Sequence, residues 1–202
     1  MKLIKLLSLG LILVIFQFAS SDAGDITGFV KAKRSKYLPK TVVYIESAPG
    51  DFTPPEKNPV IDQKNMIFSP HILPVLVGTT VDFLNSDDVA HNVFSPDKSA
   101  DKMNLGTWPK GEIRSFTFKN SCEKVCDPVL LCNVHPEMEA YVVVIDNPYF
   151  SKADDSGFFK ISGVPPGKYN VKVWHPKRKA EDVSIVMPDS GSVEIEFALK
   201  KK

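Results

Sequence analysis

Three side chains that can bind a soft metal ion lie within seven residues of one another in the segment 131–144, LCNVHPEMEAYVVV. They are Cys132, His135 and Met138, which offer a thiol, an imidazole and a thioether. The segment then becomes an apolar run typical of a buried β-strand. Three ligands on one short loop make up most of a metal site, so a fourth group must come from elsewhere in the chain.

The best candidate for the fourth ligand is His91, in the segment VDFLNSDDVAHNVFS, where it follows a predicted strand and its turn. A thiolate, two imidazoles and a weak thioether suit copper, and they suit zinc less well because a thioether is a poor zinc ligand. Strands at both ends of the ligand loop would hold the ligands in place while copper changes oxidation state. The pattern therefore predicts a redox-active copper site.

The other two cysteines, Cys122 and Cys126, are four positions apart. In an oxidising compartment such thiols pair, which predicts a disulfide and leaves Cys132 as the free thiolate. A binuclear copper centre also uses two cysteines, but it requires a histidine four residues after the second one. Leu130 occupies that position, so the spacing argues against a binuclear centre.

The N-terminal segment has the features of a secretory signal peptide. Lys2 and Lys5 precede an apolar run over residues 6–18, and small residues follow up to Ala23. The run is short for a membrane span, although an uncleaved anchor remains an alternative. We expect residues 1–23 to be removed, the protein to be exported, to the periplasm if the source is bacterial, and no stable membrane insertion after cleavage.

Composition favours an all-β protein. The chain of 202 residues is rich in Val, Ile, Phe, Pro and Gly, and no long segment after residue 24 repeats apolar residues at helical spacing. Alternation between turn residues predicts strands over 26–30, 41–46, 60–68, 75–84, 114–119, 129–131, 141–145, 157–161, 168–174, 182–186 and 193–199.

Charge argues against nucleic acid as a partner. The chain has 25 Lys and Arg and 24 Asp and Glu, and removing residues 1–23 leaves 23 of each. A nucleic-acid-binding protein normally shows a strongly basic face, and this balance does not indicate one.

The region 60–146 resembles the cupredoxins, the small blue-copper proteins. The resemblance is carried by MIFSPHILPVLVGTTVDFLNSD, HNVFS and LCNVHPEMEAYVVVID, and the Cys-x-x-His-x-x-Met spacing matches the amicyanin-type ligand loop. It implies a Greek-key β-sandwich or barrel that binds one type 1 copper ion. His91, Cys132 and His135 would be the strong ligands and Met138 the axial one. Asn92 would link the His91 and Cys132 segments and tune the thiolate by hydrogen bonding.

The C-terminal segment DDSGFFKISGVPPGKYNVKVWHP resembles the carboxypeptidase regulatory-like, transthyretin-type β domain. The segment TGFVKAKRSKYLPKTVVYIE, which precedes the copper region, fits the opening strands of that domain. We therefore expect a cupredoxin domain over 58–147, inserted into a small β-sandwich formed by 25–48 and 149–202. The alternative is a cupredoxin over 25–147 followed by a separate β module over 149–202.

The combination resembles a family of exported cupredoxin-like proteins with an appended β domain, some of them named methylamine-utilisation proteins. The predicted function is one-electron transfer between envelope redox proteins, with a c-type cytochrome or a dehydrogenase as partner. The alternative is a copper-binding or copper-delivery protein without a redox partner. An enzyme with several copper sites is disfavoured, because the chain has four histidines and we expect two of them, His71 and His175, to be structural.

Overall fold

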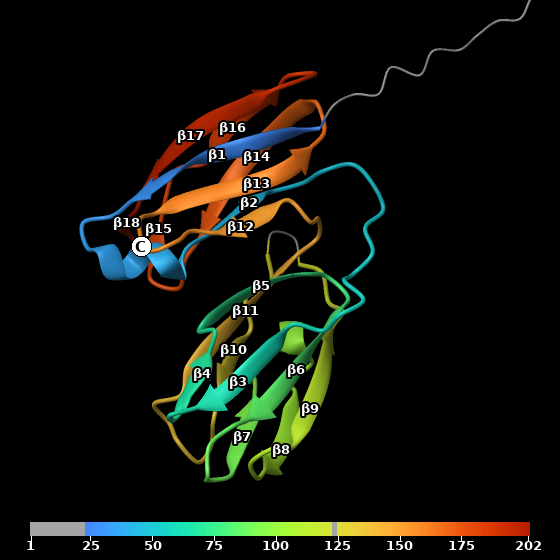
Figure 1. The fold of residues 1–202 in the computed structure, drawn as a ribbon, viewed down its shortest axis with the longest axis vertical. Helices are drawn as coiled ribbons and strands as arrows, with labels where there is room; N and C mark the ends of the chain where they lie inside the picture. Colours follow the sequence, from blue (N-terminus) through green and yellow to red (C-terminus); the bar gives the residue numbers. More distant parts are fainter. Residues whose placement is uncertain (1–22, 123–124) are drawn as a thin grey trace, which may run out of the picture.

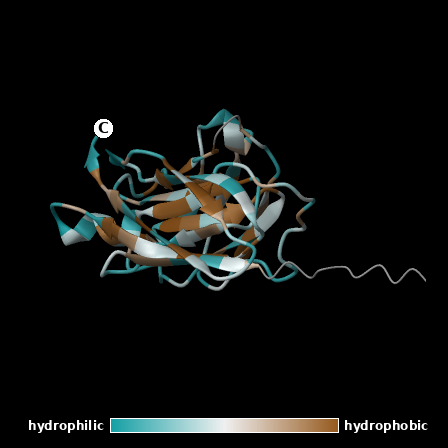
Figure 2. Ribbon diagram, turned by 90° about the horizontal axis from the view of Figure 1, so that it is seen from above, coloured by the Kyte–Doolittle hydropathy of each residue, from teal (hydrophilic) through white to brown (hydrophobic). Residues whose placement is uncertain are grey.

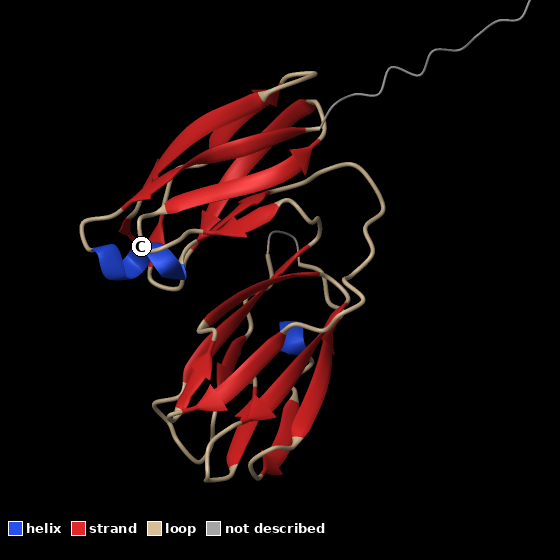
Figure 3. Ribbon diagram, in the orientation of Figure 1, coloured by secondary structure: helices blue, strands red, loops and turns tan. Residues whose placement is uncertain are grey.

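The computed structural model describes residues 23–122 and 125–202, so nearly all of the predicted signal peptide lies outside the described residues. The described chain consists almost entirely of strands and turns (Figure 3), and the all-β expectation is confirmed. Within these two ranges no helix combines the length and the apolar character that crossing a bilayer requires.

The segment that contains the candidate ligands forms a β-sandwich of two sheets, drawn in the lower half of Figure 1. Large apolar side chains from both sheets, including Phe83, Trp108 and Phe118, fill the space between them. One sheet has the strand order β5 (Ile72–Leu76), β11 (Glu139–Ile145), β10 (Val129–Leu131), β7 (His91–Phe94) and β8 (Asn104–Trp108). The other has the order β4 (Ile67–Ser69), β3 (Val60–Lys64), β6 (Thr79–Asn85) and β9 (Ile113–Phe118).

Two strands predicted as continuous are each broken by a turn. The segment 60–68 folds into the hairpin of β3 and β4, because Asn65 and Met66 take positive φ angles of 56° and 59°. The segment 75–84 is interrupted at Gly78, whose φ of 86° suits a residue without a side chain. Strands β7 and β8 were not predicted, and His91 is the first residue of a strand rather than part of a loop.

The remaining strands form a second sandwich, in the upper half of Figure 1, with an apolar core of its own. The apolar residues, brown in Figure 2, lie mainly on strands, and many loops are hydrophilic. The first two strands of the described chain pair here with strands that follow residue 149. One sheet has the order β13 (Phe158–Val164), β1 (Gly24–Lys31) and β17 (Ser192–Ala198), and another has β12 (Phe150–Lys152), β2 (Val42–Ile45), β14 (Gly167–Trp174) and β16 (Val183–Met187). Smaller elements here are the pair β15 (Arg178–Lys179) and β18 (Lys200–Lys201) and the 3-10 helix η1 (Ser35–Lys40). The 3-10 helix η2 (Lys98–Ala100) instead contributes Ala100 to the core of the first sandwich.

An apolar cluster joins the two sandwiches. It is formed by Val42, Tyr44, Ile72, Val143, Ile145 and Trp174. The Trp174 indole donates a hydrogen bond to the Asp127 carboxylate at 2.9 Å, and the Asn147 amide donates one to the Ile45 carbonyl at the same distance. Strand β11 therefore packs against the second sandwich at its C-terminal end, and its N-terminal end follows directly after Met138.

Candidate metal centre

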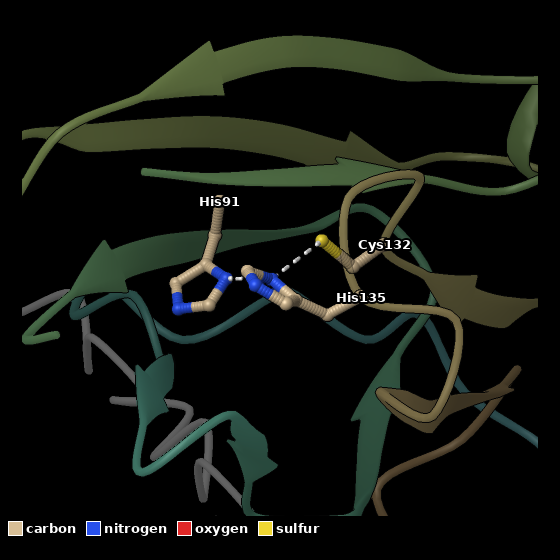
Figure 4. Close-up of side chains that lie close together, drawn as sticks. All are labelled: His91, Cys132 and His135. Carbon is tan, nitrogen blue, oxygen red and sulfur yellow. Dashed lines mark hydrogen bonds between the residues drawn. The ribbon is translucent and has the colours of Figure 1, made fainter. Parts of the chain in front are cut away.

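Three of the four predicted ligands converge at one end of the first sandwich. The Nδ1 atoms of His91 and His135 lie 3.0 Å apart, and the Cys132 Sγ lies 4.0 Å from the His135 Nδ1 (Figure 4). One ligand atom from each of the three residues falls within 4.8 Å of the others. Among the described His, Cys, Asp and Glu residues, this is the group of three or more that is compact enough to hold a metal ion.

Two neighbouring strands of one sheet place these residues. His91 starts β7, where it pairs with Trp108 of β8, and Cys132 directly follows the last residue of β10. His135 lies in the loop between β10 and β11, and the Met138 N–H closes that loop on the His135 carbonyl at 3.0 Å. Met138 is fully buried and belongs to the same core cluster as Cys132. The close spacing in sequence thus becomes a tight loop over the end of the core.

Asn92 links the two ligand segments. Its backbone N–H points at the Cys132 Sγ at 3.5 Å, and its side-chain oxygen accepts the Asn133 N–H at 3.3 Å. The Asn92 amide nitrogen donates to the Asn104 side chain and to the Gly106 carbonyl, which anchors the group to β8. An N–H aimed at sulfur stabilises the thiolate form and restrains its position, as partners of metal ligands commonly do.

Sequence reasoning missed Asp87. Its Oδ2 accepts a hydrogen bond from the His91 Nε2 at 2.8 Å, on the side of the ring opposite the Nδ1 atom. Burial tends to raise the pKa of Asp87, but the Met66 N–H, the His91 ring and the Asn65 N–H together hold it below its usual value. The only feature of the sequence that could have indicated Asp87 is its position four residues before the candidate ligand His91. The adjacent Asp88 made the choice between the two aspartates ambiguous.

The three cysteines have the predicted pairing. Cys122 and Cys126 form a disulfide with a Cα–Cα distance of 5.4 Å. Cys132 is free and 3% exposed, so its sulfur is protected from solvent and is available to a metal. Among the described cysteines, the site therefore offers a metal ion one free thiol.

The other two histidines lie away from the cluster. His71 is half-buried in a pocket that residues of both sandwiches line, and its Nε2 lies 3.9 Å from the Glu139 carboxylate. His175 is buried in the second sandwich, where its Nδ1 accepts the Lys177 N–H at 2.9 Å. Burial, reinforced by the charges of Lys202, Arg178 and Lys40, lowers the pKa of His175 to about 4. Within the described chain neither histidine belongs to a metal-binding group.

The donor set fits copper. Two imidazole nitrogens 3.0 Å apart can bind one ion, because metal–nitrogen bonds of roughly 2.0 Å span that gap from a shared centre. Two imidazoles and one thiolate, with a buried methionine following on the same loop, match the ligand types of a mononuclear electron-transfer copper site. The same three strong ligands could also bind zinc, but a methionine would then have no role as a ligand.

Comparisons with known proteins find similar chains among solved structures. No protein-family profile matches, and no curated protein matches. Among solved structures, a reduced mutant of amicyanin is similar over 50% of this chain and 97% of its own, with 24% identity and a TM-score of 0.40. An oxidised amicyanin mutant is similar over 44% of this chain and 83% of its own, with 26% identity and a TM-score of 0.39.

Proposed function

We propose that this protein is a type 1 copper protein that carries single electrons between redox partners. The observation that supports it best is the convergence of one thiol and two imidazole Nδ1 atoms at the end of a β-sandwich core. His91 and Cys132 are buried, and Asn92 and Asp87 restrain them by hydrogen bonds. Copper bound in such a site supplies a one-electron couple. The protein holds the ligands, excludes water and limits rearrangement.

The proposed route for electrons is the His135 edge. His91 has no exposed surface, whereas His135 is partly exposed on the loop between β10 and β11. Val134, next to His135 in the sequence, is 52% exposed, and Val89, two residues before His91, is 47% exposed. Partners in redox encounters bury little surface and bind transiently, which suits a small apolar patch around a ligand edge.

Charge separation within the chain suggests the kind of partner. Residues 49–148 carry 8 Lys and Arg against 14 Asp and Glu, whereas residues 24–48 and 149–202 together carry 15 against 9. The near-neutral net charge is therefore the sum of an acidic segment, which contains the copper-binding sandwich, and a basic remainder. Complementary charge accelerates association, so we propose a redox protein with a basic face, such as a c-type cytochrome.

Export and an inserted copper domain complete the proposal. The Cys122–Cys126 disulfide supports an oxidising compartment such as the periplasm. The pairing of β1 and β2 with strands after residue 149 supports a copper domain inserted into the second sandwich.

We expect Val134→Lys to slow electron exchange between the copper-loaded protein and a c-type cytochrome by roughly tenfold, equivalent to ~1.4 kcal/mol. A lysine beside His135 would disrupt close apolar contact and repel a basic partner. Stopped-flow kinetics would measure the rate, and the visible spectrum would show that the copper site is unchanged. The matched control is Val186→Lys, at a 66% exposed valine of β16 in the second sandwich. A slower rate in the control, with Val134→Lys unaffected, would place docking on the second sandwich instead.

A further inference from the structure

We infer that Asp87 is a positioning residue for the copper ligand His91, and that its carboxylate makes the site favour Cu(II) over Cu(I). The inference rests on the proposed copper function. It concerns a residue that touches the ligand rather than the metal.

The Asp87 carboxylate is held by three N–H donors. Its Oδ1 accepts the Asn65 N–H at 2.6 Å, and its Oδ2 accepts the Met66 N–H at 2.9 Å as well as the His91 Nε2 at 2.8 Å. Asn65 and Met66 form the turn between β3 and β4, and their positive φ angles direct both amides to this one carboxylate. The hairpin of the opposite sheet therefore supports the ligand on β7.

The turn that contains Asp87 is itself fixed. The Asp87 N–H donates to the Asn85 Oδ1 at 2.9 Å, and the Asn85 amide nitrogen donates to the Val89 and Trp108 carbonyls. Asn85 is completely buried, and the Asp87 side chain is 14% exposed. A carboxylate restrained on both sides can fix the orientation of the imidazole that it contacts.

This contact also selects the tautomer of His91. An ionised carboxylate only accepts hydrogen bonds, so the His91 Nε2 must carry the proton, and the Nδ1 of the neutral ring carries a lone pair. That Nδ1 faces the His135 Nδ1 at 3.0 Å, so both nitrogens are directed toward one shared position. Asp87 therefore keeps His91 in the form that a metal ligand needs.

A carboxylate behind an imidazole makes the ring a stronger electron donor. A stronger donor stabilises the more highly charged oxidation state, so the negative charge of Asp87 should favour Cu(II) and lower the reduction potential. The neighbouring Asp88 offers an internal comparison. Its side chain is 91% exposed and forms an ion pair with Lys110 at 2.7 Å. It carries the same charge one residue away without contacting His91.

The test compares Asp87→Asn with the matched control Asp88→Asn. We expect Asp87→Asn to weaken Cu(II) affinity by about tenfold or more, the usual effect of losing a partner of a metal ligand, and Cu(I) affinity by much less. A tenfold difference between the two oxidation states raises the potential by ~59 mV. Asp87→Glu, which restores the charge, should recover much of the Cu(II) preference.

A measurement without copper separates this inference from the proposed function. Nitrogen-15 NMR of the metal-free protein should show His91 protonated at Nε2, and Asp87→Ala should remove that preference while Asp88→Asn retains it. The inference is wrong if His91 is protonated at Nδ1 in the wild type. It is equally wrong if Asp87→Asn and Asp88→Asn have the same potential and the same Cu(II) affinity. Failure of the wild type to bind copper would instead overturn the proposed function.

Discussion

We expect Cys132→Ser to abolish the intense visible absorption of the copper-loaded protein and to weaken copper binding strongly. The colour of a type 1 site arises from charge transfer between a thiolate and Cu(II) in a trigonal geometry. A serine hydroxyl stays protonated at neutral pH and is a harder, weaker ligand. Serine is similar in size to cysteine, so the buried position 132 should keep its packing. Absorption spectroscopy during a copper titration measures both effects.

The double variant Cys122→Ser/Cys126→Ser is the matched control for that experiment. In the wild type the Cys122 and Cys126 sulfurs are bound to each other in the disulfide, so neither is a thiolate ligand. The control should retain the full colour and the copper stoichiometry of the wild type. The assignment of Cys132 would be wrong if its serine variant stayed coloured, or if the control lost its colour.

The second large effect is a difference in copper affinity between the variants His91→Ala and Met138→Leu. Loss of a partner of a ligand costs about 10–100-fold in metal affinity, so loss of the ligand His91 should cost more than that. The alanine variant also leaves Asp87 without its imidazole. Met138→Leu should keep a coloured site and raise the reduction potential, because the axial thioether is a weak, long ligand that donates mainly to Cu(II).

Stability measurements test whether either variant loses copper simply because the sandwich unfolds. Leucine and methionine have similar volumes, so we expect Met138→Leu to cost less than about 1.5 kcal/mol of the free energy of unfolding. Thermal unfolding of the metal-free variants would show whether the sandwich is intact. If Met138→Leu lost copper and His91→Ala kept a coloured site, the ligand roles would be reversed and the proposed site would be incorrect.

The sequence predicted the parts of the site that depend on local spacing. Cys132, His135 and Met138 share one short loop, so their proximity follows from the chain itself. His91 was found because imidazole and thiolate suit the same metal, and an adjacent asparagine fitted the resemblance. The disulfide was also predictable, because Cys122 and Cys126 are four positions apart and the third cysteine of the chain, Cys132, was already assigned to the metal site.

The parts that were missed depend on contacts between distant segments. Strands β7 and β8 are short and contain polar residues, so alternation did not reveal them, although β7 carries His91. The break at Gly78 and the turn at Asn65 and Met66 were hidden inside apolar runs. The role of Asp87 is apparent only in the structure, where the Asn65 and Met66 N–H groups of that turn donate to its carboxylate. A carboxylate in the sequence SDD is usually an exposed turn residue, and Asp88 is one.

The most direct test of the proposed function is a titration of the purified, metal-free protein with Cu(II), followed by visible absorption and electron paramagnetic resonance. A site built from the His91, Cys132 and His135 ligand atoms predicts saturation at one copper per chain, with an intense visible charge-transfer band and the narrow copper hyperfine splitting of a thiolate-bound type 1 centre. A pale complex with the wide splitting of ordinary tetragonal Cu(II), or saturation at no copper or at two per chain, would contradict it.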